Sequence, residues 1–241
     1  MMILITGQIY PSRIKVQFEN FAITENIGTE REITYRLSGK DNVITIEVEG
    51  KSLNDHNKIV QRTRLYSRSV LNCLGVEFGE IIECSLERAL INGQEVNLRV
   101  YSEPMAMVAE ELGIKAIDIF SVVSNNPLAL LALDDLVVAS ADVFLVPINC
   151  ARCVESLGHI LSTSEKATER WERLRNVLSL TRAYVQPISD ASIDHRHGFR
   201  MDKIERNYGE IVKRSWEIYK RFLAYELNDR KELDSEKFPK I

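Results

Sequence analysis

The chain has 241 residues, which is enough for one large domain or two smaller ones, because single domains usually span ~100–150 residues. Hydrophobic residues make up 45% and charged residues 27%, and this mixture excludes a disordered or fibrous chain. The formal net charge of -4 neither indicates nor excludes a nucleic-acid partner, since the distribution of charge matters more than its sum.

Charge is distributed unevenly along the chain. Residues 1–75 carry 10 basic and 8 acidic side chains, residues 76–163 carry 4 and 13, and residues 164–241 carry 17 and 14. An acidic middle therefore separates two mildly basic ends, and we expect a partner with a phosphate backbone to contact the ends.

The sequence predicts a cytoplasmic protein without a membrane partner. Its first residues, MMILITGQIYPSR, lack the basic region of a secretory signal. The most apolar stretch, residues 128–148, contains three aspartates and a proline, whereas a spanning helix needs ~20 nearly uncharged residues. Four cysteines in a chain of this length, without a signal, are typical of reduced thiols.

The first hundred residues are predicted to form strands and one helix. Segments 3–10, 13–18, 31–37 and 42–50 alternate apolar and polar residues with a period of two. Residues 55–74 have helical periodicity, and Gly75 is predicted to end that helix. Segments 80–90 and 95–101 flank Asn92-Gly93, which is a strong signal for a hairpin.

The remainder is predicted to be helical. We expect helices over residues 105–112, 127–146, 147–161, about 165–178, 182–193 and 201–227, and a frayed, charged segment after them. Pro147 either starts a helix or kinks one. The sequence therefore predicts an α+β protein with a β-rich domain of about six strands and one helix over residues 1–103. A helical bundle follows over residues 104–241.

The first candidate site lies before Gly198. His195 and His197 could exchange protons near neutral pH, Arg196 could hold a phosphate, and Asp190 lies nearby. Basic residues followed by a glycine are equally typical of a helix C-terminus, where they interact favourably with the helix dipole. A catalytic and a structural interpretation both remain open.

The layout of the helical half resembles the prokaryotic HEPN superfamily over about residues 125–227. The matching pieces are a glutamate-bearing helix at 153–157, a tryptophan helix at 169–175, a short helix ending in His197-Gly198, and a long closing helix. The resemblance implies a small helical bundle, a homodimer that pairs its sites, and a role in bacterial defence or toxin–antitoxin systems. Active members are metal-independent endoribonucleases that use an arginine followed by four to six residues and a histidine.

This sequence departs from that motif. The arginine slots hold Ser192, Ala191 and Asp190 before His197, and Asp190, Ser189 and Ile188 before His195. The resemblance therefore implies a non-catalytic or altered member, with no cofactor. If RNA were cleaved, a ribose 2′-hydroxyl would attack its own phosphate, with a histidine as general acid/base and Arg196 stabilising the charge.

The second candidate site is the helix that carries Lys58, Arg62, Arg64 and Arg68. At 100° per residue the four basic groups are predicted to lie opposite the apolar face, where they could bind a phosphate backbone or an acidic partner. A solvated helix face is the alternative interpretation.

Other motifs indicate structure rather than chemistry. Cys150 and Cys153 form a CxxC pair, but they continue an apolar stripe, so we expect buried thiols and no metal site. Asp134-Asp135 is interpreted as a surface break in an apolar helix. Two hypotheses remain: a HEPN-like protein that binds RNA or a partner protein, with at most altered ribonuclease activity, and a non-enzymatic interaction module with a β-rich assembly domain.

Overall fold

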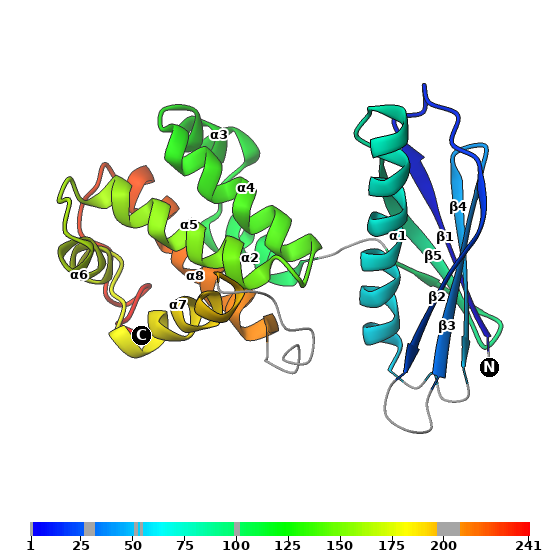
Figure 1. The fold of residues 1–241 in the computed structure, drawn as a ribbon. Coiled ribbons are helices and arrows are strands. Elements are labelled where there is room, and N and C mark those ends of the chain that lie inside the picture. Colours follow the sequence, from blue (N-terminus) through cyan, green and yellow to red (C-terminus); the bar gives the residue numbers. More distant parts are fainter. Residues whose placement is uncertain (1, 27–31, 51–52, 54, 99–101, 197–207) are drawn as a thin grey trace. The chain divides into compact units, whose positions relative to one another are not determined.

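The computed structural model describes residues 2–26, 32–50, 53, 55–98, 102–196 and 208–241. The chain divides into two compact units, Met1–Val100 and Tyr101–Ile241 (Figure 1). The sequence placed this division three residues later, after residue 103. The first unit contains a sheet and one helix, and the second is helical, so the predicted α+β class is confirmed.

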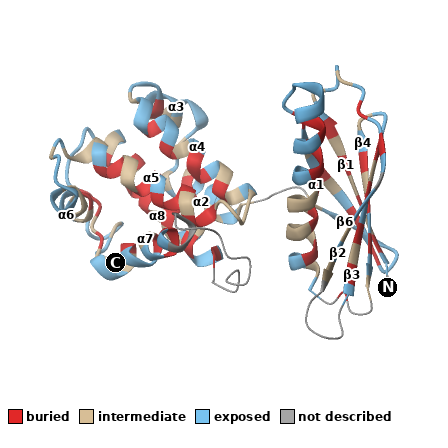
Figure 2. Cartoon of the chain, in the orientation of Figure 1, coloured by how far each residue is buried: buried red, intermediate tan, exposed pale blue. Residues whose placement is uncertain are grey.

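The first unit is built on an antiparallel sheet whose described strands lie in the order β2-β3-β4-β1-β5-β6. The strands are β1 (Met2–Tyr10), β2 (Phe18–Asn26), β3 (Glu32–Lys40), β4 (Val43–Gly50), β5 (Glu83–Ile91) and β6 (Gln94–Asn97). Alternate residues of the central strands, such as Ile5, Tyr35 and Ile46, are buried on one face. Helix α1 (His56–Phe78) packs on that face (Figures 1 and 2).

Both short hairpins have the backbone that their turn residues favour. Asp41 and Asn42 have φ of 52° and 63° between β3 and β4. Asn92 and Gly93 have φ of 52° and 79° between β5 and β6, as the Asn-Gly signal predicted.

The predicted strand at residues 13–18 is wrong, because β2 begins only at Phe18. The chain before it is held by the β3–β4 turn instead. The Val16 N–H donates to Asn42 Oδ1 at 3.0 Å, and Asn42 Nδ2 donates to the Ser12 carbonyl at 3.2 Å. These bonds replace the pairing that a strand would need, and they could not be inferred from local periodicity.

The predicted end of α1 at Gly75 is also wrong. The helix continues to Phe78, and Gly79, with φ of 67°, forms the C-cap. Gly75 serves a different purpose, because a Cβ there would lie 2.6 Å from the carbonyl oxygen of Glu80. The missing side chain lets the chain after the helix return close to it, and the Glu80 N–H donates to the Gly75 carbonyl at 3.0 Å.

The second unit consists of helices packed around a common core. They are α2 (Glu103–Leu112), α3 (Ala116–Ser124), α4 (Pro127–Ala141), α5 (Val146–Leu161), α6 (Ala167–Val177), α7 (Arg182–Arg196) and α8 (Tyr208–Leu227). Helix α3 was not predicted. The helix predicted over residues 127–146 ends at Ala141, because Asp142 is extended and its Oδ1 accepts the Phe144 N–H at 3.0 Å. A new helix then starts next to Pro147. None of the described helices could cross a bilayer.

Helices α5 and α8 supply much of the core of this unit. Val154, Leu157 and Phe222 are almost completely buried. Two of the buried aromatic residues of α8 have hydrogen-bond partners on α4: Trp216 Nε1 donates to Ser140 Oγ at 2.9 Å, and the Tyr219 hydroxyl donates to the Ala129 carbonyl at 3.3 Å.

The predicted fraying of the C-terminal segment, residues 228–241, is wrong. Leu233 is buried in the core, and the Arg221 guanidinium lies over the Phe238 ring. The backbone of Ile241 pairs with the turn before α7: its N–H donates to the Ser179 carbonyl at 3.2 Å, and its carbonyl accepts from the Thr181 N–H. Charge in the sequence suggested a solvated tail, but a few apolar residues hold the segment in place.

Candidate functional site

The histidine-rich candidate site falls largely outside the described part of the chain. His197 belongs to the residues that are not described, as do the side chains of His195 and Arg196, which end helix α7. Asp190 is exposed on α7, where its Oδ1 accepts a hydrogen bond from Gln186 Nε2 at 2.7 Å. The grouping of these four residues therefore remains a prediction.

The predicted basic stripe on α1 is wrong for two of its four residues. Arg62 and Arg64 lie at the two sides of the buried arc, not opposite it. Arg62 Nε lies 3.4 Å from Glu25 Oε1, with the two side chains only 13% and 16% exposed. Arg64 donates to the Leu98 carbonyl at 3.0 Å. Of the four, Lys58 and Arg68 are exposed.

Arg62 instead belongs to a polar cluster between α1 and the sheet. The Tyr66 hydroxyl donates to the same Glu25 oxygen, and the Tyr66 ring packs edge-to-face on Tyr35 with centroids 4.9 Å apart. Burial, more than the nearby Glu25 carboxylate, raises the pKa of the Tyr35 phenol. This cluster fastens the edge strand β2 to the helix, which is a structural role.

The paired cysteines are buried, as predicted. Burial raises the pKa of Cys150 to about 12 and that of Cys153 well above its ordinary value. Both thiols are therefore protonated at neutral pH and poorly suited to nucleophilic chemistry.

The interpretation of Asp134-Asp135 as a surface break holds for Asp134 alone. Asp135 is 6% exposed, and its Oδ1 lies 3.5 Å from a guanidinium nitrogen of Arg152. Burial raises the pKa of the Asp135 carboxyl, and the Arg152 charge opposes this rise.

The most distinctive surface of the helical unit lies on α3 and α4, which expose large apolar side chains. Ile117 is 67% exposed, Phe120 61%, and Leu130 52%. We call the α3–α4 surface the set Ile117, Phe120, Leu128, Leu130, Leu131 and Val137. Both helices are apolar on their outer as well as their inner sides, a property usually found in fully buried helices.

The α3–α4 surface is acidic where it is charged. Asp134 is exposed and, at 100° per residue, falls on the same arc of α4 as Leu130 and Val137. The sequence contains no lysine or arginine between Lys115 and Arg152. The acidic middle of the chain was predicted from the sequence, but the exposure of α4 was not. The sequence signal for that exposure is that α4 carries large apolar residues on its outer arc as well as on its inner arc.

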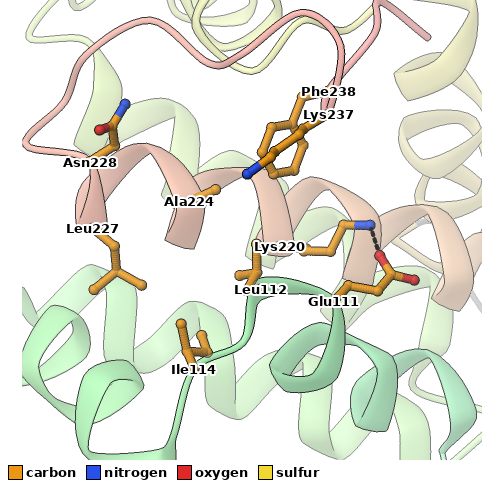
Figure 3. Close-up of a pocket in the computed structure, with 9 residues that line it drawn as sticks. All are labelled: Glu111, Leu112, Ile114, Lys220, Ala224, Leu227, Asn228, Lys237 and Phe238. Carbon is orange, nitrogen blue, oxygen red and sulfur yellow. Dashed lines mark hydrogen bonds and ion pairs between the residues drawn. The ribbon is translucent and has the colours of Figure 1, made fainter.

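A second feature is a groove along α8 with a volume of about 510 Å³. Figure 3 shows α8 between two walls, one formed by Lys237 and Phe238 of the C-terminal segment and the other by Leu112 and Ile114. Glu111 and Lys220 form an ion pair at one end. The groove exists only because residues 228–241 fold back, and no sequence motif marked it.

The geometry thus defines a two-unit α+β protein whose helical unit carries an apolar surface and a separate groove. Residues 114–227 match the model of the C-terminal domain of DUF8168, a domain of unknown function. That match includes the whole of the α3–α4 surface and of α8, but not Lys237 or Phe238. Searches of curated proteins and of solved structures found no match.

Proposed function

We propose that this chain is a non-enzymatic, HEPN-like binding protein that holds a partner protein on the α3–α4 surface. The exposure of Ile117, Phe120 and Leu130 carries the proposal, since each is more than half exposed. Large apolar side chains gathered on one surface are typical of interaction sites. Burying one of them fully is worth roughly 1.5–3 kcal/mol, so a few suffice for specific binding.

Charge selects the kind of partner. Asp134 lies among the apolar residues of α4, and neither α3 nor α4 itself contains a lysine or arginine. RNA and anionic lipid headgroups would be repelled there, whereas an amphipathic helix with a lysine or arginine beside its apolar stripe would be attracted. A second copy, packed symmetrically about Asp134, would bring two like charges together.

Binding is proposed rather than catalysis because the sequence lacks the arginine of the HEPN motif. The slots that the motif requires hold no arginine before either His195 or His197. The described candidate residue Asp190 is exposed and hydrogen-bonded to Gln186, and that arrangement does not activate a nucleophile.

The test uses a synthetic amphipathic helix of leucine and lysine, and a matched helix of leucine and glutamate. Fluorescence anisotropy of labelled peptide should show tight binding of the lysine helix only. Leu130→Glu and Ile117→Glu should each weaken it about tenfold or more. Ile81→Glu is the matched control, because Ile81 is 81% exposed but belongs to the other unit. Asp134→Lys should reverse the preference between the two peptides.

Three outcomes would overturn the proposal. Equal binding of both peptides would show that Asp134 does not select a cationic partner. Sedimentation velocity showing a dimer that Leu130→Glu dissociates would assign the surface to a second copy. A salt-dependent RNA shift lost on Lys58→Glu/Arg68→Glu, without peptide binding, would make the chain a nucleic-acid binder.

A further inference from the structure

We infer that the groove along α8 binds a small amphipathic anion, with a single negatively charged head and an apolar chain. This site is separate from the α3–α4 surface, and the inference goes beyond the proposed protein-binding function. The groove has a volume of about 510 Å³, which lies within the usual range of ~300–1,000 Å³ for small-molecule sites.

Most of the groove is apolar. Leu112 and Ile114 form one wall, Phe238 stands on the other, and Ala224 and Leu227 of α8 lie between them (Figure 3). Leu227 remains 39% exposed, although it lies on a helix whose other large apolar residues are mostly buried. The apolar part of this channel favours an unbranched apolar chain, because it provides dispersion contacts, whereas the polar lining residues are Glu111, Lys220, Asn228 and Lys237.

At the polar end of the groove, the charge of Lys220 is already balanced by neighbouring carboxylates. Lys220 is 13% exposed, and its ammonium forms ion pairs with Glu111 of α2 and with Glu217 of α8. These contacts fix its position and leave little of its charge for a ligand. Glu111, in turn, would repel an anion placed directly beside it.

Lys237 is the cation that remains for a ligand. It lines the groove beside Phe238, and Figure 3 shows its ammonium directed over α8, toward Ala224. No ion pair of Lys237 occurs within the described part of the chain. The lining holds two lysines, of which Lys220 is offset by Glu111 and Glu217, so Lys237 is the cation of the lining that no described carboxylate offsets by an ion pair. An ammonium at the rim of an apolar channel suits a carboxylate head whose chain enters the channel.

The segment that carries Lys237 is held in place by contacts of the residues that follow it. Phe238 lies under the Arg221 guanidinium, and the backbone of Ile241 pairs with that of Ser179. A preorganised wall lowers the entropic cost of binding. Packing of Phe238 and pairing of Ile241 therefore hold the segment from which Lys237 projects.

Isothermal titration calorimetry with dodecanoate, below its micellar concentration, tests the inference on the full chain. We expect saturable binding of dodecanoate, and much weaker binding of dodecyltrimethylammonium and of dodecanol. Lys237→Glu should weaken dodecanoate binding about tenfold or more, and Lys237→Arg should retain it. Lys240→Glu is the matched control, because Lys240 is exposed in the same segment but does not line the groove.

A second variant tests the apolar channel. Leu227→Asp should abolish dodecanoate binding, with the fold verified by circular dichroism. Absence of dodecanoate binding to the wild-type chain would overturn the inference. Equal binding of the cationic probe, or binding that neither Lys237→Glu nor Leu227→Asp changes, would do so as well. Because the peptide experiment uses residues of α3 and α4 only, either proposal can fail without the other.

Discussion

The guanidinium of Arg221 lies over the ring of Phe238, with Cζ 5.6 Å from the ring centroid. Arg221 is almost completely buried, and it also donates to the carbonyls of Leu178 and Ser179 at 3.1 and 3.2 Å. One side chain of α8 therefore joins the turn before α7 to the C-terminal segment. The fold of the last fourteen residues depends on this connection.

Phe238→Ala should lower the free energy of unfolding of the helical unit by about 2 kcal/mol, because a half-buried ring and its cation–π contact are both lost. Urea denaturation measures the change. Lys240→Ala, two residues further along the same segment, should leave the urea concentration at the midpoint of unfolding unaltered.

Arg221→Met should cost about 3 kcal/mol, because it leaves two carbonyls and the Glu217 carboxylate without their buried partner. The pair of Arg230 and Glu226 offers the comparison, because the Arg230 side chain is 55% exposed, and Arg230→Met should cost less than about 1 kcal/mol. A smaller effect of Arg221→Met than of Arg230→Met would contradict the role given to Arg221.

The stability of the helical unit should fall in acid, partly through Glu217. Partial burial raises the pKa of this carboxyl, but hydrogen bonds from Lys220 and Arg221 outweigh it, so that the pKa is lowered from 4.5. A carboxyl with a lowered pKa contributes stability above its unfolded value and loses it as the pH falls through the folded value. Thermal unfolding of Glu217→Gln between pH 3 and 7 should therefore show a weaker pH dependence than the wild type.

The effect of Asp135 on the pH dependence of stability should be opposite to that of Glu217. Burial raises its pKa above 3.8, so the ionised carboxylate destabilises the folded state at neutral pH, and protonation relieves this as the pH falls through the raised pKa. Asp135→Asn should raise the melting temperature, relative to the wild type, more at pH 7 than at pH 3. Asp134→Asn, at the exposed neighbouring position, is the matched control.

Thiol reactivity should distinguish the four cysteines. Cys73 is exposed and should react with Ellman's reagent within seconds, whereas Cys150 and Cys153 are buried and should react only after unfolding. Cys84 should react slowly, because burial raises its pKa to about 11. Fast labelling of Cys150 or Cys153 in the native protein would argue against the packing of α5.

Incubation with single-stranded RNA, without divalent metal, should yield no cleavage by the wild-type chain or by His195→Ala/His197→Ala. The expectation follows from the missing arginine of the HEPN motif. Cleavage by the wild type that the double variant loses would restore the enzymatic interpretation.

Sequence periodicity predicted the class of each half because local preferences and tertiary structure agree there. The turn at Asn92-Gly93 and the helix stop at Gly113 follow from the positive φ that these residues tolerate. The start of β2 was missed because the chain before it is held by Asn42, which is distant in sequence. The continuation of α1 through Gly75 was missed because that glycine allows the close approach of Glu80 and does not end the helix.

The candidate sites were less predictable than the fold. Exposure of α3 and α4 cannot be inferred from an apolar pattern, because the same pattern is typical of a buried helix. The groove brings Lys237 and Phe238 to Leu112 and Ile114, which lie more than a hundred residues earlier. Charge alone also misplaced Arg62, since its partner Glu25 belongs to a different element.

The backbone pairing of Ile241 with Ser179 has a mechanical consequence. Ser179 occupies the left-handed region, with φ of 53°, in the turn that precedes α7. That turn is the far anchor of the segment that supplies Lys237, so a change of its backbone would shift the rim of the groove without altering any residue that lines it. Access to the channel along α8 is thereby adjustable from a distance.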